Sequence, residues 1–66
     1  MTFREWAIEN NNDNRDFHII LKLRNGSKIF YHSNQQISYM DLYVLQDSTI
    51  VEKELVDDEW FFVLTV

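Results

Sequence analysis

The spacing of apolar residues changes along the chain, from a helical period near the N-terminus to a period of two further on. Thr2 is followed three residues later by Glu5, which is the spacing of a capping box. In that motif each side chain accepts a hydrogen bond from the backbone N–H of the other residue. Phe3 and Trp6 then fall on one side of a helix. The pattern predicts a short helix over residues 3–10, which the asparagine-rich run that follows brings to an end.

Residues 16–24 alternate between apolar and polar side chains, as in a strand that is buried on one face. An Asn-Gly dipeptide follows, and residues 29–32 supply the return strand, so this part of the chain predicts a β-hairpin. Two registers are compatible with the sequence. A two-residue turn pairs Arg24 with Ser27, whereas a three-residue turn with a bulge pairs Arg24 with Lys28.

Three further strands are predicted in the second half of the chain, after a loop at residues 33–36 and with turns at 46–48 and 57–58: residues 37–45, 49–56 and 59–66. A helix followed by five strands with short connections indicates an α+β fold built on a five-stranded antiparallel meander. The sheet is expected to be either open or curled into a small barrel. Residues 1–66 are expected to form a single small domain, with the helix over 3–10 and the antiparallel sheet over 16–66.

The composition is that of a folded chain, with 45% hydrophobic and 15% aromatic residues. There is no cysteine, so disulfides and thiolate metal sites are excluded. No stretch approaches the roughly 20 apolar residues of a membrane helix, and acidic residues occupy the N-terminal region where a signal peptide would be apolar. The expected location is therefore the cytoplasm. The absence of proline and the frequent Asn and Ile fit an AT-rich coding sequence, which suggests a phage or mobile-element origin.

The motifs of catalysis and cofactor binding are missing: the chain has one glycine, no cysteine nucleophile and no metalloprotease-type histidine spacing. His18 and His32 are diagonal neighbours on one sheet face in the bulged register, but they point to opposite faces in the tight-turn register. Asp16 and Asn34 are the only oxygen donors expected near them, so no third ligand is evident. The sequence predicts a protein that is not an enzyme, with no cofactor, no metal site and no catalytic residue.

Charge is distributed unevenly, with a net charge of −2 over residues 1–14, +3 over 15–32 and −6 over 33–66. The total of −5 disfavours direct binding of nucleic acid. The acidic second half could instead dock a basic protein surface, in the way that inhibitors which mimic DNA do. The alternative interpretation is that these acids keep the chain soluble and prevent pairing at a strand edge.

The predicted strands 37–45 and 60–66 carry apolar residues on both faces, which is more than one short helix can cover. Tyr39 and Tyr43 on the first of them are typical binding residues, because they combine a large contact area with a polar group. We therefore expect a protein-interaction module that binds a protein partner, or a second copy as a homodimer, through an aromatic sheet face and an acidic flank. Two alternatives remain: an acidic inhibitor of a nucleic-acid-binding enzyme, and a structural homo-oligomeric subunit. The predicted partner-binding residues are Tyr39, Tyr43, Glu52, Glu54, Asp57, Asp58 and Glu59.

Overall fold

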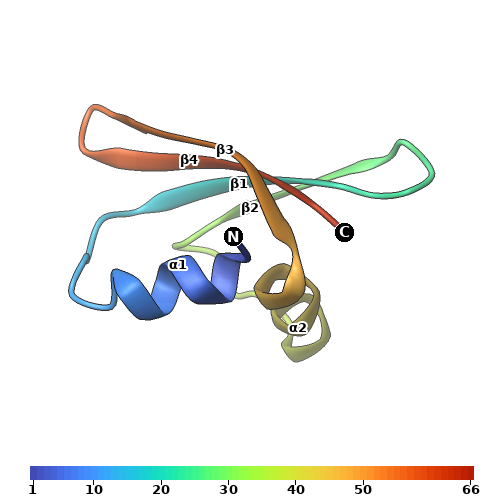
Figure 1. Cartoon of the computed structure of the whole chain (residues 1–66), viewed down its shortest axis with the longest axis horizontal. Helices are drawn as coiled ribbons and strands as arrows, with labels where there is room; N and C mark the ends of the chain where they lie inside the picture. Colours follow the sequence, from blue (N-terminus) through green and yellow to red (C-terminus); the bar gives the residue numbers. More distant parts are fainter.

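A computed structural model describes all 66 residues and has two helices on one side of a four-stranded sheet (Figure 1). The elements are α1 (Phe3–Glu9), β1 (Phe17–Lys22), β2 (Lys28–His32), α2 (Tyr39–Asp47), β3 (Thr49–Val56) and β4 (Glu59–Thr65). The strand order is β2-β1-β4-β3. β1 and β2 form one antiparallel hairpin, and β3 and β4 form the second. The two hairpins meet at the central strands β1 and β4, which run parallel. The prediction of an α+β fold is confirmed. The five-stranded antiparallel meander and the curled barrel are wrong, because the sheet has four strands, is mixed and is open. Neither helix is long and apolar enough to cross a membrane.

Helix α1 begins with the predicted capping box. The Glu5 N–H donates to Thr2 Oγ1 at 3.2 Å, and the Thr2 N–H donates to Glu5 Oε1 at 2.8 Å. The bond from the Thr2 N–H to the Glu5 carboxylate favours the ionised form and is the largest cause that lowers the pKa of Glu5. The helix ends one residue earlier than predicted, where the Asn10 side chain donates to the Trp6 carbonyl at 2.9 Å. Because local hydrogen bonds define both ends, the local sequence was sufficient to predict α1.

The first hairpin forms as predicted, but in neither of the two proposed registers. Leu23 pairs with Ser27 around a three-residue loop, Arg24–Gly26, in which the Gly26 N–H donates to the Leu23 carbonyl at 3.1 Å. Gly26 has a φ of +89°, the left-handed conformation that glycine adopts without strain. A turn closed by a left-handed third residue is a common hairpin loop, and it places glycine one position later than a tight Asn-Gly turn does. This register also keeps Leu23 against the core.

The segment predicted as a third strand, residues 37–45, is instead largely helical, as α2. Ser38 caps this helix, since its hydroxyl accepts a hydrogen bond from the Asp41 N–H at 3.2 Å. Apolar side chains lie all around α2, so the segment also matches the two-residue period of a strand. Helix α2 connects β2 to β3 at opposite edges of the sheet. This connection brings β4 alongside β1 in parallel, which a meander does not allow.

The core lies between the helices and the sheet. Side chains of the central strand β4 point alternately toward this core and away from it. Trp60, Phe62 and Leu64 point toward the helices, whereas Phe61 and Val63 point to the opposite side. The apolar C-terminal run therefore has helical cover on one face only. The core residues come from both helices and the two central strands: Phe3, Trp6, Ile19, Leu21, Leu45, Phe62 and Leu64.

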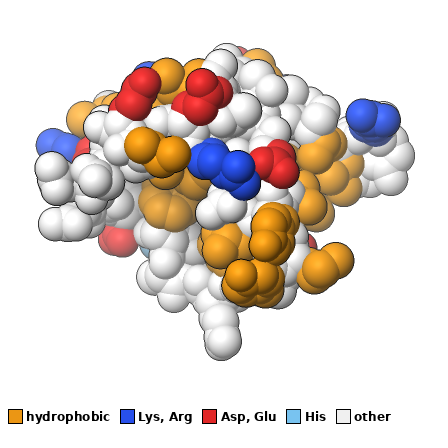
Figure 2. Space-filling view, turned by 60° about the horizontal axis from the view of Figure 1, so that its bottom comes forward, with side chains coloured by type: hydrophobic (Ala, Val, Ile, Leu, Met, Phe, Trp, Pro, Cys, Tyr) orange, Lys and Arg blue, Asp and Glu red, His pale blue; other side chains and the backbone are white.

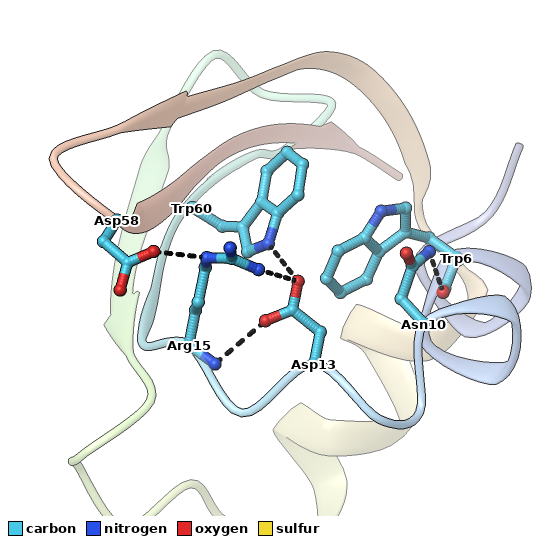
Figure 3. A network of polar contacts seen from close by, with 6 residues as sticks. All are labelled: Trp6, Asn10, Asp13, Arg15, Asp58 and Trp60. Carbon is cyan, nitrogen blue, oxygen red and sulfur yellow. Dashed lines mark hydrogen bonds and ion pairs between the residues drawn. The ribbon is translucent and has the colours of Figure 1, made fainter.

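A polar network ties the linker after α1 to the second hairpin (Figure 3). Asp13 accepts hydrogen bonds from Trp60 Nε1 at 2.9 Å, the Arg15 N–H at 2.9 Å and Arg15 Nη1 at 3.0 Å. Arg15 Nε in turn donates to Asp58 at 2.6 Å. The bond from Trp60, followed by the bonds from Arg15, lowers the pKa of Asp13, because each donor favours the ionised carboxylate. The Asp58 and Asp13 carboxylates raise the pKa of Arg15.

The network predicts a specific acid sensitivity of folding. A carboxylate whose pKa is depressed in the native state stabilises that state above its unfolded pKa of about 3.9, and the contribution is lost as the pH falls through the native value. Asp13→Asn should therefore lower the melting temperature at pH 7, and the difference from the parent protein should shrink below about pH 3. Thermal unfolding followed by circular dichroism across this pH range measures both effects.

Asp57→Asn is the matched control, because Asp57 forms no side-chain hydrogen bond or ion pair, and asparagine tolerates its φ of 51°. The control variant should follow the parent protein at every pH. A constant deficit of Asp13→Asn from pH 7 to pH 2 would contradict the assigned role of the ionised carboxylate.

Candidate functional site

The side of the sheet away from the helices, called the open face below, is not covered by any element of the chain. A groove of about 380 Å³ lies along it. Phe30 is 68% exposed and Phe61 is 41% exposed, which is unusual for phenylalanine in a folded domain. The side chains of the open face come from all four strands: His18, Ile20, Phe30, His32, Glu52, Glu54, Glu59, Phe61 and Val63.

Charges of opposite sign flank the apolar centre of the open face. Lys22 pairs with Lys28 at the end of β1 and β2 next to the first hairpin loop. Glu52 and Glu54 lie on the edge strand β3, opposite Val63 and Phe61 of β4, after a bulge in β3 that sets their register. Neither Glu52 nor Glu54 takes part in the Arg–Asp ion pairs or in the His–Glu contacts of the molecule. We call these two free carboxylates the acidic flank.

Two histidines and a glutamate meet on the open face where β2, β1 and β4 run side by side. His18 pairs directly with His32, and their rings are 4.2 Å apart in an edge-on arrangement. Glu59 Oε1 lies 3.1 Å from His18 Nε2 and 3.9 Å from His32 Nε2. The His18 ring also stacks on Phe61, with the planes only 5° apart and the centroids 4.5 Å apart. The three polar side chains, which we call the His-His-Glu cluster, are all half-buried.

A second exposed apolar area lies on the helical side of the molecule, over α2 (Figure 2). Tyr39 and Tyr43 pack edge-on at 5.3 Å, and they are 75% and 54% exposed. Met40 is exposed beside them. Asp41 of the same helix faces Tyr31 of β2, and burial together with this carboxylate raises the pKa of Tyr31.

The predicted partner-binding residues do not form one surface. Tyr39 and Tyr43 lie on α2, on the covered side of the sheet, whereas Glu52 and Glu54 lie on the open face. Asp57 and Asp58 form the β3–β4 turn, as predicted, both with positive φ, and Asp58 is paired with Arg15. Glu59 belongs to the His-His-Glu cluster.

An aromatic sheet face does exist, but its aromatic residues are Phe30 and Phe61, which the sequence interpretation did not select. Phe30 lies in the predicted return strand, but its neighbours Ile29 and Tyr31 are also apolar or aromatic, so the sequence does not show which face is exposed. The contact of Glu59 with the histidines was missed for a different reason. His18 and Glu59 are 41 residues apart in the sequence and meet through the parallel pairing of β1 with β4, which no local pattern indicates.

Comparison with protein-family models, with curated proteins and with solved structures found no match. The function therefore has to be inferred from the geometry and chemistry of the surfaces described above.

Proposed function

We propose that this protein is a non-enzymatic protein-interaction module whose open face binds a partner protein. The partner is expected to present an apolar segment flanked by basic side chains. The observation that carries this proposal is that the exposed Phe30 and Phe61 line one groove together with the free carboxylates of Glu52 and Glu54. Exposed apolar patches rimmed by polar residues are typical of interaction sites, and the core of such interfaces is enriched in aromatic side chains.

The net charge favours a basic protein over a second copy of this chain as the binding partner of the open face. The chain carries a net charge of −5, so a second copy is repelled at long range while a basic partner is attracted. The acidic flank supplies carboxylates that no side chain of the molecule neutralises. Lys22 and Lys28 at the other end of the face would favour one orientation of the bound segment.

Site-specific photo-crosslinking in the host cell tests this proposal. A benzoylphenylalanine at position 61 is expected to crosslink to one basic protein, whereas the same group at position 40 on α2 should not.

With that partner purified, Phe61→Ala should weaken binding by about tenfold or more, as expected for an aromatic anchor. Replacing Glu52 and Glu54 together by lysine should weaken binding further and reverse its dependence on salt.

The other outcomes identify the alternatives. Crosslinks only between copies of this chain, obtained from position 40, would support a homo-oligomeric subunit assembled through α2 and contradict the proposal. A crosslinked nucleic-acid enzyme that DNA displaces from this protein would support the acidic-inhibitor alternative. Unchanged affinity of both variants for the crosslinked partner would show that the open face is not the binding surface.

A further inference from the structure

We propose that His18, His32 and Glu59 form a binding site for one divalent transition-metal ion, with Zn²⁺ as the best match. This inference is independent of the proposed function, since it concerns the His-His-Glu cluster and not the apolar centre or the acidic flank. The three side chains come from β1, β2 and β4 and point to the same side of the sheet. One donor atom from each residue lies within 4.8 Å of the other two.

The distances are close to those of a metal site. Zn²⁺ binds histidine nitrogen and carboxylate oxygen at about 2.0–2.2 Å, so two ligands of a tetrahedral ion are roughly 3.3–3.5 Å apart. His18 Nε2 and Glu59 Oε1 are separated by 3.1 Å, which fits. His32 Nε2 is 3.9 Å from the same oxygen, and a side-chain shift of about 0.5 Å brings it into range. The donor nitrogens of the two histidines lie within 4.8 Å of each other, so they also have to come closer. The direct pairing of His18 with His32 across the strands leaves rotation of the two side chains as the way to do so.

The surroundings hold the two imidazole rings in orientations suited to a metal ion. His32 Nδ1 lies 2.5 Å from Asn34 Oδ1 and 3.1 Å from the Asn34 N–H. These two contacts need opposite protonation states of Nδ1, so only one is made at a time. When Nδ1 carries the proton and donates to Asn34 Oδ1, the lone pair of Nε2 points toward the cluster. A hydrogen bond of this kind from the non-ligating nitrogen is the usual support of a metal-bound histidine. Stacking on Phe61 restrains the plane of the His18 ring.

The chemical type of the three ligands determines which metal ions the site would bind. Two imidazoles and one carboxylate suit Zn²⁺, and also Ni²⁺ and Cu²⁺, whereas Mg²⁺ and Ca²⁺ require oxygen ligands. The half-buried cluster lies on the open face, so water has access to complete the coordination. In the metal-free protein His18 Nε2 and Glu59 Oε1 share a hydrogen bond. A bound ion would take the place of the proton in that bond.

Binding should be coupled to folding, because the ligands are 14 and 27 residues apart in sequence and meet only in the sheet. An ion that binds the native state and not the unfolded chain stabilises the native state by mass action. At a free Zn²⁺ concentration of 100 times Kd, the unfolding equilibrium constant should fall by a factor of about 100. The ion would link β2, β1 and β4, that is, one hairpin to the other.

The test uses the untagged 66-residue chain, because a polyhistidine tag would bind the same ions. Isothermal titration calorimetry with zinc chloride is expected to give one site per chain, and the melting temperature should rise with zinc concentration but not with magnesium concentration. His32→Ala and Glu59→Gln should each weaken zinc binding by about tenfold or more, in line with the loss of one of three ligands. Glu54→Gln, on the same face but outside the cluster, is the matched control and should bind as the parent protein does.

Circular dichroism without metal establishes that each variant is folded, and Co²⁺ supplies a second readout. The Co²⁺-loaded parent protein should show visible absorption bands of a low-coordinate nitrogen and oxygen site, and Glu59→Gln should lose them. If the parent protein shows no saturable zinc binding, or if His32→Ala and Glu59→Gln bind zinc as tightly as Glu54→Gln, the cluster is an ordinary hydrogen-bonded group and the proposal is wrong.

Discussion

Replacing Phe62 by alanine is expected to unfold a large fraction of the protein at 25 °C. The Phe62 ring is 1% exposed, and it lies against the rings of Phe3 and Trp6 at 5.2 and 4.7 Å. Removing a buried phenylalanine side chain typically costs about 3–5 kcal/mol. A domain of this size has a total stability on the order of 3–10 kcal/mol. The loss is therefore comparable with the whole free energy of unfolding, and α1 loses the surface on which it packs.

The neighbouring Phe61 provides a control of the same residue type on the same strand. Phe61 is 41% exposed and points to the open face, so part of its ring stays in water and its removal leaves no enclosed cavity. Phe61→Ala should therefore cost less than about 2 kcal/mol. Urea unfolding followed by tryptophan fluorescence measures both values. Similar losses for the two variants would contradict the assignment of one covered face and one open face to β4.

Leu45→Ala is expected to detach α2 from the rest of the protein. Leu45 is the only buried residue of this helix and is 1% exposed, so the helix has one apolar anchor in the core. The expected cost is about 2–5 kcal/mol, the range for a buried leucine. Because a nine-residue helix is marginal in water, α2 should lose its helical structure once that anchor is removed.

Leu42→Ala is the matched control, with the same substitution on the same helix. Leu42 is 39% exposed and its removal leaves no enclosed cavity, and alanine recovers a few tenths of a kcal/mol of helix propensity at most. Stability should therefore fall by only about 1 kcal/mol. Hydrogen exchange of the α2 amides, combined with urea unfolding, distinguishes local loss of the helix from global unfolding. If Leu42→Ala is the more damaging change, the orientation of α2 described here is wrong.

The apolar residues on all sides of α2 explain why residues 37–45 were wrongly predicted to be a strand. An amphipathic helix reveals itself by a polar face, and α2 has none that is continuous. A segment that is apolar on all sides satisfies the periods of both helix and strand, so the local pattern cannot separate them. The Ser38 and Asp41 pair was the available signal for a helix, since a serine three residues before an acidic residue is a cap signature.

The sequence indicated that aromatic side chains would be exposed, but not which ones. The excess of apolar surface over what a short helix can cover was a correct reason to expect exposed aromatic side chains. Assigning that surface to Tyr39 and Tyr43 depended on a strand that does not form. The exposed ring of Phe61 belongs to the C-terminal run whose second face the structure leaves without helical cover.

The sequence by itself determined the elements whose hydrogen bonds close within a few residues. These are the capped helix α1, the hairpin that Gly26 permits, and the turn at Asp57 and Asp58. Only the tertiary structure decided that residues 39–47 are helical, that β1 and β4 run parallel, and that Glu59 meets His18 and His32. The physical reason is the range of the interactions. Capping and turn bonds depend on neighbours in the chain, whereas burial and strand pairing depend on which distant segments pack together, and two helices on one face leave the other face open.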